Sequence, residues 1–253
     1  MANNKIAIVT GGNRGLGKSM ALHLAKQNTN VVITYNTNEA EANATVAEIE
    51  NTGASALALQ LNIGNIASLA NFTQTVSTAM QQKWNATHFD FLINNAGIGA
   101  TIPFMQATEE QFDNFMNVHF KGVYFLTQKL VPLMNNGGRI INISSGTTRF
   151  CNPGYSIYAS MKSAIETFSR YLAKELSEKR IAVNVVAPGA IETDFNNAFV
   201  RNNPQVKSMI AANTAMGRTG VPEDIGGIVA FLCSPEAGWI NAQRIEATGG
   251  VWL

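Results

Sequence analysis

The sequence predicts a single α/β domain, a doubly wound parallel sheet of about seven strands with helices on both faces. Two patterns indicate this fold. Short runs rich in β-branched residues alternate along the chain with longer stretches of amphipathic helical periodicity. A glycine-rich turn follows the first of these runs and opens the first helical stretch. The length of 253 residues fits one domain, 1–253, with a large core.

The predicted strands are short apolar runs bounded by turn residues. Right-handed crossovers between parallel strands place their carboxyl ends at one edge of the sheet, where nucleotides bind. We expect strands over residues 6–9, 30–35, 56–61, 89–94, 139–144, 181–187 and 244–247.

The predicted helices carry apolar residues at the three- and four-residue spacing that gives a helix one buried face. They lie between the strands, as crossover connections must. We expect helices over residues 16–26, 39–51, 66–83, 109–134, 156–178 and 222–232.

Residues 190–216 show no clear periodicity and are too many for a simple connector. We expect this segment to be a substrate lid. Its apolar side chains are suited to cover a ligand; they are Phe195, Phe199, Val200, Met209 and Ile210.

The first turn is a candidate phosphate-binding loop. Glycines between a strand and a helix let the backbone approach a pyrophosphate, and the helix N-terminus supplies free N–H groups and a positive dipole. The spacing Gly-x-x-x-Gly-x-Gly differs from the standard dinucleotide fingerprint, and alone it is also compatible with a tight turn. The turn reads Thr10-Gly11-Gly12-Asn13-Arg14-Gly15-Leu16-Gly17.

A second group of residues suggests proton transfer to or from an oxygen atom. Tyr158 and Lys162 are one helical turn apart on one helix face, so the lysine ammonium should favour the phenolate and lower the tyrosine pKa. Ser145 ends an apolar strand, where its hydroxyl can hold a substrate oxygen. Asn117 completes the set of four candidates. Ser144 competes with Ser145 for its role, but its spacing to Tyr158 is one residue too long. Taken alone, Tyr158 and Lys162 are also compatible with a surface pair.

The ordered set of these motifs resembles the short-chain dehydrogenase/reductase family, in the branch of this chain's length, over essentially the whole sequence. Within it, the chain is similar to 3-oxoacyl-(acyl carrier protein) reductases and related carbonyl reductases. The resemblance implies a Rossmann-like fold and an NAD(P)-dependent oxidoreductase acting on a CH–OH group. Besides the first turn and the four candidates, the resemblance rests on Asn94-Asn95-Ala96-Gly97, Pro188-Gly189 and the stretch 216–225.

The resemblance also implies a role for each candidate. Tyr158 would be the general acid or base, and Ser145 would hydrogen-bond the same substrate oxygen. Lys162 would lower the pKa of Tyr158 and hold the nicotinamide ribose, while Asn117 would anchor a water that passes protons to Lys162. The expected cofactor-binding residues are Gly11, Asn13, Arg14, Gly15, Leu16, Gly17, Tyr35, Asn36, Asn62, Ile63, Asn94, Ala96, Gly97, Tyr158, Lys162, Pro188, Gly189, Ile191 and Thr193.

The residues near the adenosine ribose favour NADP(H) over NAD(H). The position that carries an acidic residue in NAD-binding relatives corresponds to Tyr35, and residues 31–38 contain no carboxylate. Arg14 offers a planar, permanently charged group to a phosphate. The alternative for Arg14 is an exposed turn residue in a surface ion pair.

The substrate is expected to be a ketone or secondary alcohol with at least one apolar arm. We expect a general carbonyl reductase, with a 3-oxoacyl-(acyl carrier protein) reductase as the alternative and a non-catalytic NADP(H)-binding sensor as a further one. Arg149 could select a carboxylate-bearing substrate or be a solvated loop residue. The pocket candidates are Ser145, Phe150, Cys151, Tyr155, Phe195 and Phe199.

Composition restricts the partners and the compartment. The net charge is +1, which favours neither nucleic acid nor an anionic membrane as a partner. The N-terminus shows no signal segment, and two cysteines form no disulfide framework, so we expect a cytoplasmic protein. His23, His88 and His119 are too scattered for a metal site and are interpreted as structural or surface groups.

Apolar residues near Trp239 and Trp252 suggest a homotetramer, unless Trp252 folds back on its own subunit.

Overall fold

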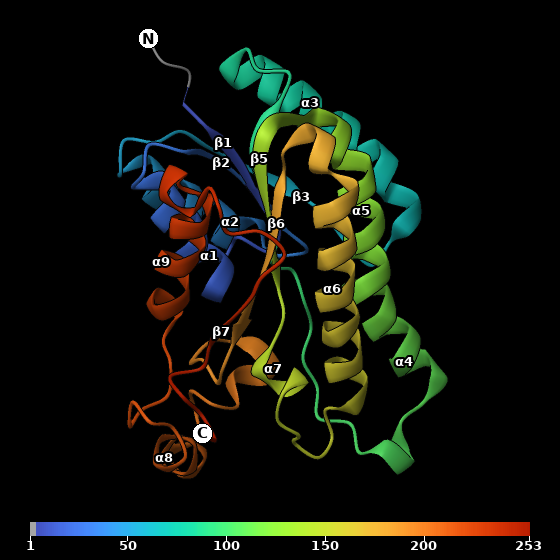
Figure 1. The fold of residues 1–253 in the computed structure, drawn as a ribbon, viewed down its shortest axis with the longest axis vertical. Helices are drawn as coiled ribbons and strands as arrows, with labels where there is room; N and C mark the ends of the chain where they lie inside the picture. The colour runs from blue at the N-terminus through green and yellow to red at the C-terminus, as the bar shows by residue number, and fades with distance from the viewer. Residues whose placement is uncertain (1–3) are drawn as a thin grey trace.

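The apolar runs form one seven-stranded parallel sheet in the computed structural model, which describes residues 4–253 (Figure 1). The strand order is β3-β2-β1-β4-β5-β6-β7, and every neighbouring pair is parallel. This confirms the predicted fold class. The strands are β1 (Ile6–Val9), β2 (Asn30–Tyr35), β3 (Ala56–Gln60), β4 (Phe89–Asn94), β5 (Met134–Ile143), β6 (Ala182–Pro188) and β7 (Arg244–Ala247).

Helices cover both faces of the sheet (Figure 1). Helices α1, α2 and α9 pack on one face, and α3, α5 and α6 pack on the other. The helices are α1 (Gly15–Ala25), α2 (Glu39–Glu50), α3 (Leu69–Trp84), α4 (Glu109–Met116), α5 (Gly122–Leu130), α6 (Ser156–Glu175), α7 (Phe195–Ala198), α8 (Pro204–Ala212) and α9 (Pro222–Cys233). Within residues 4–253, none of these helices is both long and apolar enough to cross a membrane.

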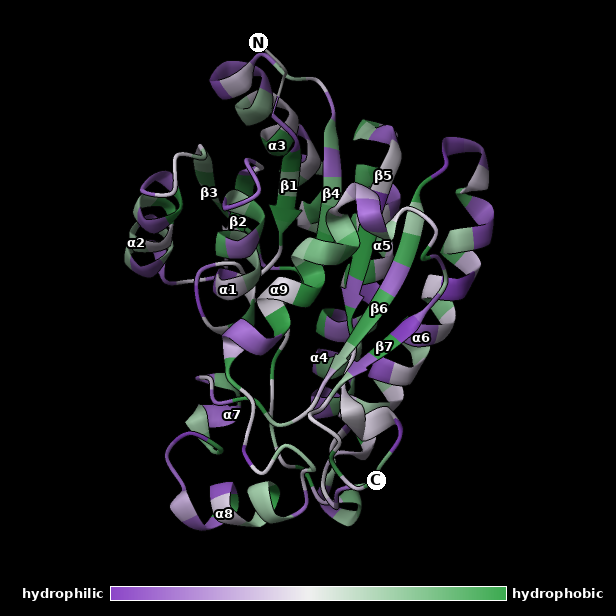
Figure 2. Ribbon diagram, turned by 60° about the vertical axis from the view of Figure 1, so that its left-hand side comes forward, coloured by the Kyte–Doolittle hydropathy of each residue, from purple (hydrophilic) through white to green (hydrophobic). Residues whose placement is uncertain are grey.

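The central strands are apolar because both of their faces are covered. Every residue of β1, β2, β4 and β6 is buried, which explains why these strands read as continuous apolar runs instead of alternating patterns. Figure 2 shows these hydrophobic strands between helices whose outer faces are hydrophilic. Burial of these runs between the two helical layers is the main stabilising contribution to the fold.

The helix predicted over 109–134 is not continuous. It is divided into α4, a π-helical turn Asn117–Lys121, α5 and a 3₁₀ turn Val131–Leu133, and β5 already begins at Met134. The π-helical turn lies where Gly122 comes very close to another segment, since a Cβ there would be 2.3 Å from the carbonyl oxygen of Ile63. Turns of this kind are common at functional sites, and this one begins at a catalytic candidate.

The segment 190–216 contains two short helices that its periodicity did not reveal, α7 and α8. Helix α8 has a capped start, because the Asn203 side chain accepts a hydrogen bond from the Val206 N–H (3.1 Å) and Pro204 occupies the first turn. Both helices lie beyond the carboxyl ends of the strands (Figure 1). The segment therefore lies at the edge of the sheet where the candidate residues gather.

Candidate active site

The site lies at the carboxyl ends of β1, β4, β5 and β6. The strand order places β1 beside β4, and the chain proceeds outward from this pair in opposite directions. Such a switch point is where open α/β sheets bind ligands, because the connections on its two sides diverge and leave a crevice.

The first turn has the geometry of a phosphate cradle. Gly15 has a φ of +53°, and a Cβ on Gly17 would lie 2.1 Å from the carbonyl oxygen of Gly11, so only glycine fits. The Asn95 side chain holds this turn by donating to the carbonyls of Thr10 (2.9 Å) and Gly11 (3.1 Å). Helix α1 starts here with no acidic residue in its first turn, so its free N–H groups and dipole favour an anion.

Arg14 is exposed beside this cradle, at the cap position of α1. Two carboxylates of α2 near the turn already have partners. Glu41 accepts from Asn13 (2.6 Å), and Glu48 pairs with Lys18 (2.7 Å). Lys18 offsets the charge of Glu48, whereas Glu41 keeps its negative charge beside Asn13.

The side chains of Tyr35 and Asn94 are largely covered by the protein. Tyr35 belongs to the core on the α1–α2 side of the sheet, while the next residue, Asn36, is exposed. Asn94 is also buried, and its amide donates to Thr127 (3.0 Å) and Asn142 (2.8 Å). The Asn94 amide is therefore engaged within the protein.

The remaining cofactor candidates lie around the same crevice. Asn62 is exposed, whereas Ile63 is buried; Ala96 and Gly97 follow β4. Gly189 follows β6, and Thr193 lies over the cradle, 3.5 Å from where a Cβ on Gly15 would be. Pro188 ends β6, and Ile191 pairs with Gly220.

Three catalytic candidates meet where β5 faces α6. Ser145 directly follows Ser144 at the end of β5 and is buried, and its Oγ accepts from the Thr147 N–H (3.2 Å) and hydroxyl (2.9 Å). Tyr158 lies in the first turn of α6, and Lys162 follows one turn later. The buried Lys162 amine donates to the Ile143 carbonyl (2.8 Å) and lies 5.6 Å from the centre of the Tyr158 ring. The fourth candidate, Asn117, is partly buried in the π-helical turn.

Burial has opposite effects on the two titrating groups of α6. It raises the pKa of Tyr158 to about 12, although a hydrogen bond with Ser145 opposes this increase. Burial also lowers the pKa of Lys162 to about 8. In the free protein, burial of the phenol is the largest effect on Tyr158, so its pKa is raised and not lowered toward neutrality. The effect of Lys162 on Tyr158 stays a prediction.

His119, which the sequence interpretation took for a structural or surface group, packs against Tyr158. It is buried, its ring makes an edge contact with Tyr158 (centroids 5.1 Å apart), and its Nε2 lies 2.8 Å from the carbonyl oxygen of Ile98. Burial lowers the pKa of His119 well below its ordinary value, so the ring is neutral and packs against Tyr158. Its position two residues after Asn117 is the signal that could have identified it.

Two further aromatic rings pack near the ring of Tyr158. Phe195 from the lid lies 5.9 Å from the Tyr158 ring, and Tyr155 lies 6.3 Å from it. Asn196 joins the lid to this wall by donating to the Tyr155 hydroxyl (3.1 Å). Residues 195 and 196 of the segment 190–216 therefore contact the first turn of α6, and the role of this segment as a lid stays a prediction.

Other pocket candidates have different surroundings. Phe150 packs against Trp252 (4.7 Å), so the C-terminus folds back on its own subunit at this ring. Arg149 pairs with Glu246 (2.7 Å) in place of the solvated side chain that the sequence offered as one alternative. Cys151 and Phe199 are exposed at the rim. Within residues 4–253, no group of His, Cys, Asp and Glu side chains is arranged to hold a metal ion.

Comparisons with known proteins agree with this geometry. A family model described as enoyl-(acyl carrier protein) reductase matches residues 11–252. The hydroxynaphthalene reductase-like protein Arp2 of Metarhizium anisopliae (strain ARSEF 549) is 36% identical over 257 residues, covering 97% of this chain and 94% of the relative.

Solved structures are similar over the whole chain. The promiscuous reductase LugOII, which catalyses keto-reduction at C1 during lugdunomycin biosynthesis, is 34% identical with a TM-score of 0.94 and full coverage of both chains. The angucycline C-6 ketoreductase LanV with bound NADP is 33% identical with a TM-score of 0.93, covering 98% of this chain and 95% of the other. A further structure of LanV contains NADP and rabelomycin.

Proposed function

Because this chain belongs to the short-chain dehydrogenase/reductase family, we propose that it is an NADP(H)-dependent ketoreductase that reduces aromatic, fused-ring ketones. The observation that carries this proposal is the convergence of Ser145, Tyr158 and Lys162 beside a glycine cradle, under an aromatic wall.

The cradle residues fit a dinucleotide that carries an additional phosphate. Gly11, Gly15 and Gly17 admit the pyrophosphate, and the N–H groups of α1 bind it. Arg14 would hold the ribose phosphate, because no carboxylate stands at the end of β2 to repel it. The NADP in the LanV structures supports the same choice.

The bound cofactor would supply the hydride, and the protein would supply the proton. Tyr158 is protonated over the whole neutral range, since its pKa is about 12, so its hydroxyl can donate to the carbonyl oxygen of the ketone. Ser145 donates a second hydrogen bond to the same oxygen, where negative charge develops in the transition state. The Lys162 ammonium stabilises the tyrosinate that proton donation leaves behind. Asn117 would place a water that returns the proton from solvent through Lys162.

The substrate class follows from the wall of the site. Phe195 and Tyr155 present rings to the position that a ketone must occupy beside Tyr158. Planar aromatic substrates match such rings in shape and in apolar character. The names of the relatives refer to hydroxynaphthalene and to angucyclines, which are fused-ring compounds.

The test is an initial-rate assay of NADPH and NADH oxidation with matched ketones. A bicyclic aromatic ketone, an aliphatic ketone of similar size and an acetoacetyl thioester would be compared at equal concentrations. The proposal expects NADPH turnover that is fastest with the bicyclic ketone. Preference for the thioester would instead support a 3-oxoacyl-(acyl carrier protein) reductase. Cofactor binding without turnover of any ketone would support a sensor.

A further inference from the structure

Glu166 is a partly buried carboxylate on α6 that the proposed chemistry does not use. It lies one turn beyond Lys162 on the helix face that carries Tyr158. One of its oxygens, Oε1, accepts hydrogen bonds from the Ser144 hydroxyl (2.6 Å), the Thr148 hydroxyl (2.8 Å) and Nε of Arg244 (2.8 Å). Ser144 and Thr148 flank Ser145 in the chain, so this carboxylate holds both sides of the Ser145 loop.

Arg244, at the start of β7, contacts the same loop from the opposite side. One guanidinium nitrogen donates to the Thr148 hydroxyl (2.9 Å) and approaches the carbonyl oxygen of Ser145 (3.4 Å). The Thr148 hydroxyl also lies 2.9 Å from that carbonyl. The backbone of Ser145 is thus fixed by Arg244 and Thr148.

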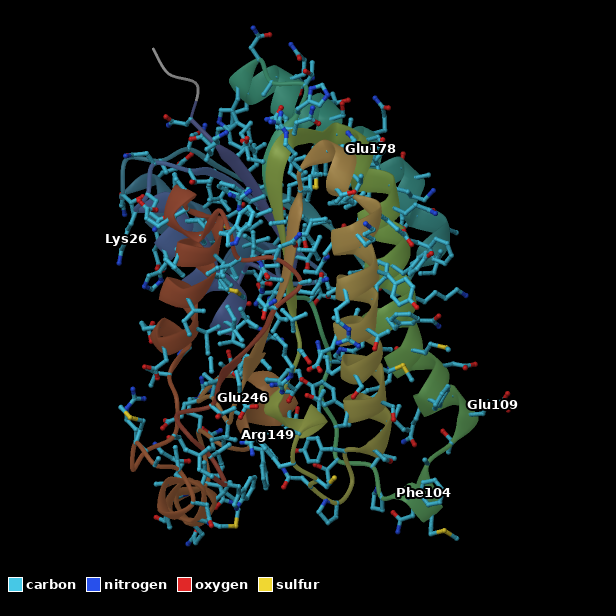
Figure 3. All side chains as sticks on the ribbon, viewed as in Figure 1. Lys26, Phe104, Glu109, Arg149, Glu178 and Glu246 are labelled. Atoms are coloured by element: carbon cyan, nitrogen blue, oxygen red, sulfur yellow. The ribbon has the colours of Figure 1, made fainter. Side chains whose placement is uncertain are left out.

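The charged contacts continue to the end of the chain. Arg244 pairs with Glu246 (2.9 Å), and Glu246 pairs with Arg149 (2.7 Å). Arg149 donates to the carbonyl oxygens of Val251 (2.6 Å) and Trp252 (3.3 Å). Figure 3 shows Arg149 and Glu246 together below the sheet. Four side chains of alternating charge therefore connect α6, the Ser145 loop, β7 and the C-terminus.

We propose that Glu166 and Arg244 are positioning residues, which fix the Ser145 hydroxyl relative to Tyr158 through the loop that both of them hold. The proposal rests on the proposed function of Ser145. Nothing in the ion-pair cluster needs to touch the ketone. The cluster acts by fixing a position, because a displaced hydroxyl loses most of its stabilisation of a developing oxyanion.

The main test is a double-mutant cycle between Arg244→Met and Ser145→Ala. In the wild-type background, Arg244→Met should lower kcat by about tenfold to a hundredfold, with the KM for NADPH little changed. In the Ser145→Ala background the same substitution should leave kcat within about twofold, since the hydroxyl that it positions is absent. Equal losses in both backgrounds would overturn the proposal.

Conservative variants and a control show whether a lower kcat comes from a general loss of structure. Glu166→Gln retains an acceptor oxygen for the two hydroxyls but removes the charge that holds Arg244, so its loss should be smaller than that of Arg244→Met. Arg244→Lys should restore part of the rate. Lys83→Met breaks the Lys83–Glu50 pair between α2 and α3 and should leave kcat unchanged. If Arg244→Met fails to fold, Glu166→Gln enters the same cycle, and additivity there would overturn the proposal.

A measurement on the free protein, which needs no turnover, tests this proposal independently of the proposed function. The ¹³Cζ resonance of Tyr158, assigned by its absence in Tyr158→Phe, reports hydrogen bonding of the phenol in the free protein. Arg244→Met should move this resonance in the direction that Ser145→Ala moves it, and should not move it further in the double variant. An unmoved resonance in Arg244→Met would overturn the positioning role, whether or not any ketone is reduced.

Discussion

The amine nitrogen of Lys162 lies 5.6 Å from the centre of the Tyr158 ring, and it is held there by the carbonyl oxygen of Ile143 at 2.8 Å. The lysine is therefore close enough to stabilise a tyrosinate but is not bonded to the phenol oxygen. Burial favours the neutral form of both groups, raising one pKa to about 12 and lowering the other to about 8. Burial is the largest cause of both shifts.

Lys162→Met should move the pH dependence of alcohol oxidation to higher pH. Oxidation needs the tyrosinate, so its rate rises with pH as Tyr158 loses its proton. Lys162 carries its charge below its pKa of about 8, and over that range its removal makes the tyrosinate less favourable. The measurement is kcat/KM for alcohol oxidation as a function of pH in both proteins. An unchanged profile would show that Lys162 does not act on Tyr158.

Tyr158→Phe should abolish reduction while cofactor binding remains. Loss of a general acid lowers the rate by about 10²- to 10⁴-fold, and phenylalanine fills the space between His119 and Phe195 without a hydroxyl. NADPH affinity, measured by fluorescence titration, should stay within about threefold, since only one hydrogen-bonding group is lost. Turnover close to the wild-type rate would contradict the assignment of Tyr158.

Arg14→Ser should weaken NADPH selectively. Loss of a charge-assisted hydrogen bond to phosphate should lower kcat/KM for NADPH by about tenfold to a hundredfold. The value for NADH, which lacks the phosphate, should hardly change. Both values are measured with the same ketone and the same protein preparation. Equal losses for the two cofactors would show that Arg14 supports the turn and does not read the phosphate.

Gly17→Ala should prevent cofactor binding and destabilise the protein, because its Cβ would lie 2.1 Å from the Gly11 carbonyl oxygen. The matched control is Gly227→Ala in α9. Gly227 is exposed, and the nearest atom to an added Cβ is 3.9 Å away. Alanine is a better helix former than glycine, so the control should raise the free energy of unfolding by about 0.5–1 kcal/mol. Urea unfolding of both variants measures these opposite effects.

The sequence predicted four strands with the bounds that the structure has, β1, β2, β4 and β7. The fully buried β6 is shifted by one residue from the expected range 181–187. The helix over 109–134 was predicted without its π-helical turn. That turn lies beside a close approach between Gly122 and Ile63, which are distant in the sequence.

The sequence predicted which side chains of the candidate site could take part in the chemistry, but not the side chains that hold them in position. Spacing alone placed Tyr158 and Lys162 on one helix face, and the same spacing extends to Glu166. Its partner Arg244 is 78 positions further along the chain, and only the pairing of β6 with β7 brings it there. Side-chain networks that join distant strands have no local sequence signal, because the fold itself creates their contacts.

Glu246→Gln should reduce the loss of stability in acid. Burial alone would raise the pKa of Glu246, but hydrogen bonds from Arg149, Arg244 and Thr248 outweigh it and lower the pKa from 4.5 to about 2. A carboxylate with a lowered pKa stabilises the folded state above its unfolded pKa, and this contribution is lost as the pH falls from about 4.5 toward 2.

The free energies of unfolding of both proteins at pH 7 and pH 3 measure the effect of Glu246→Gln. The wild-type protein should lose more stability than the variant over this interval, by at most about 2 kcal/mol. Other carboxylates with lowered pKa values titrate in both proteins, so the difference between the two isolates Glu246. Identical losses would mean that Arg149 and Arg244 do not hold Glu246 ionised, and that the charged link to the C-terminus is not maintained in solution.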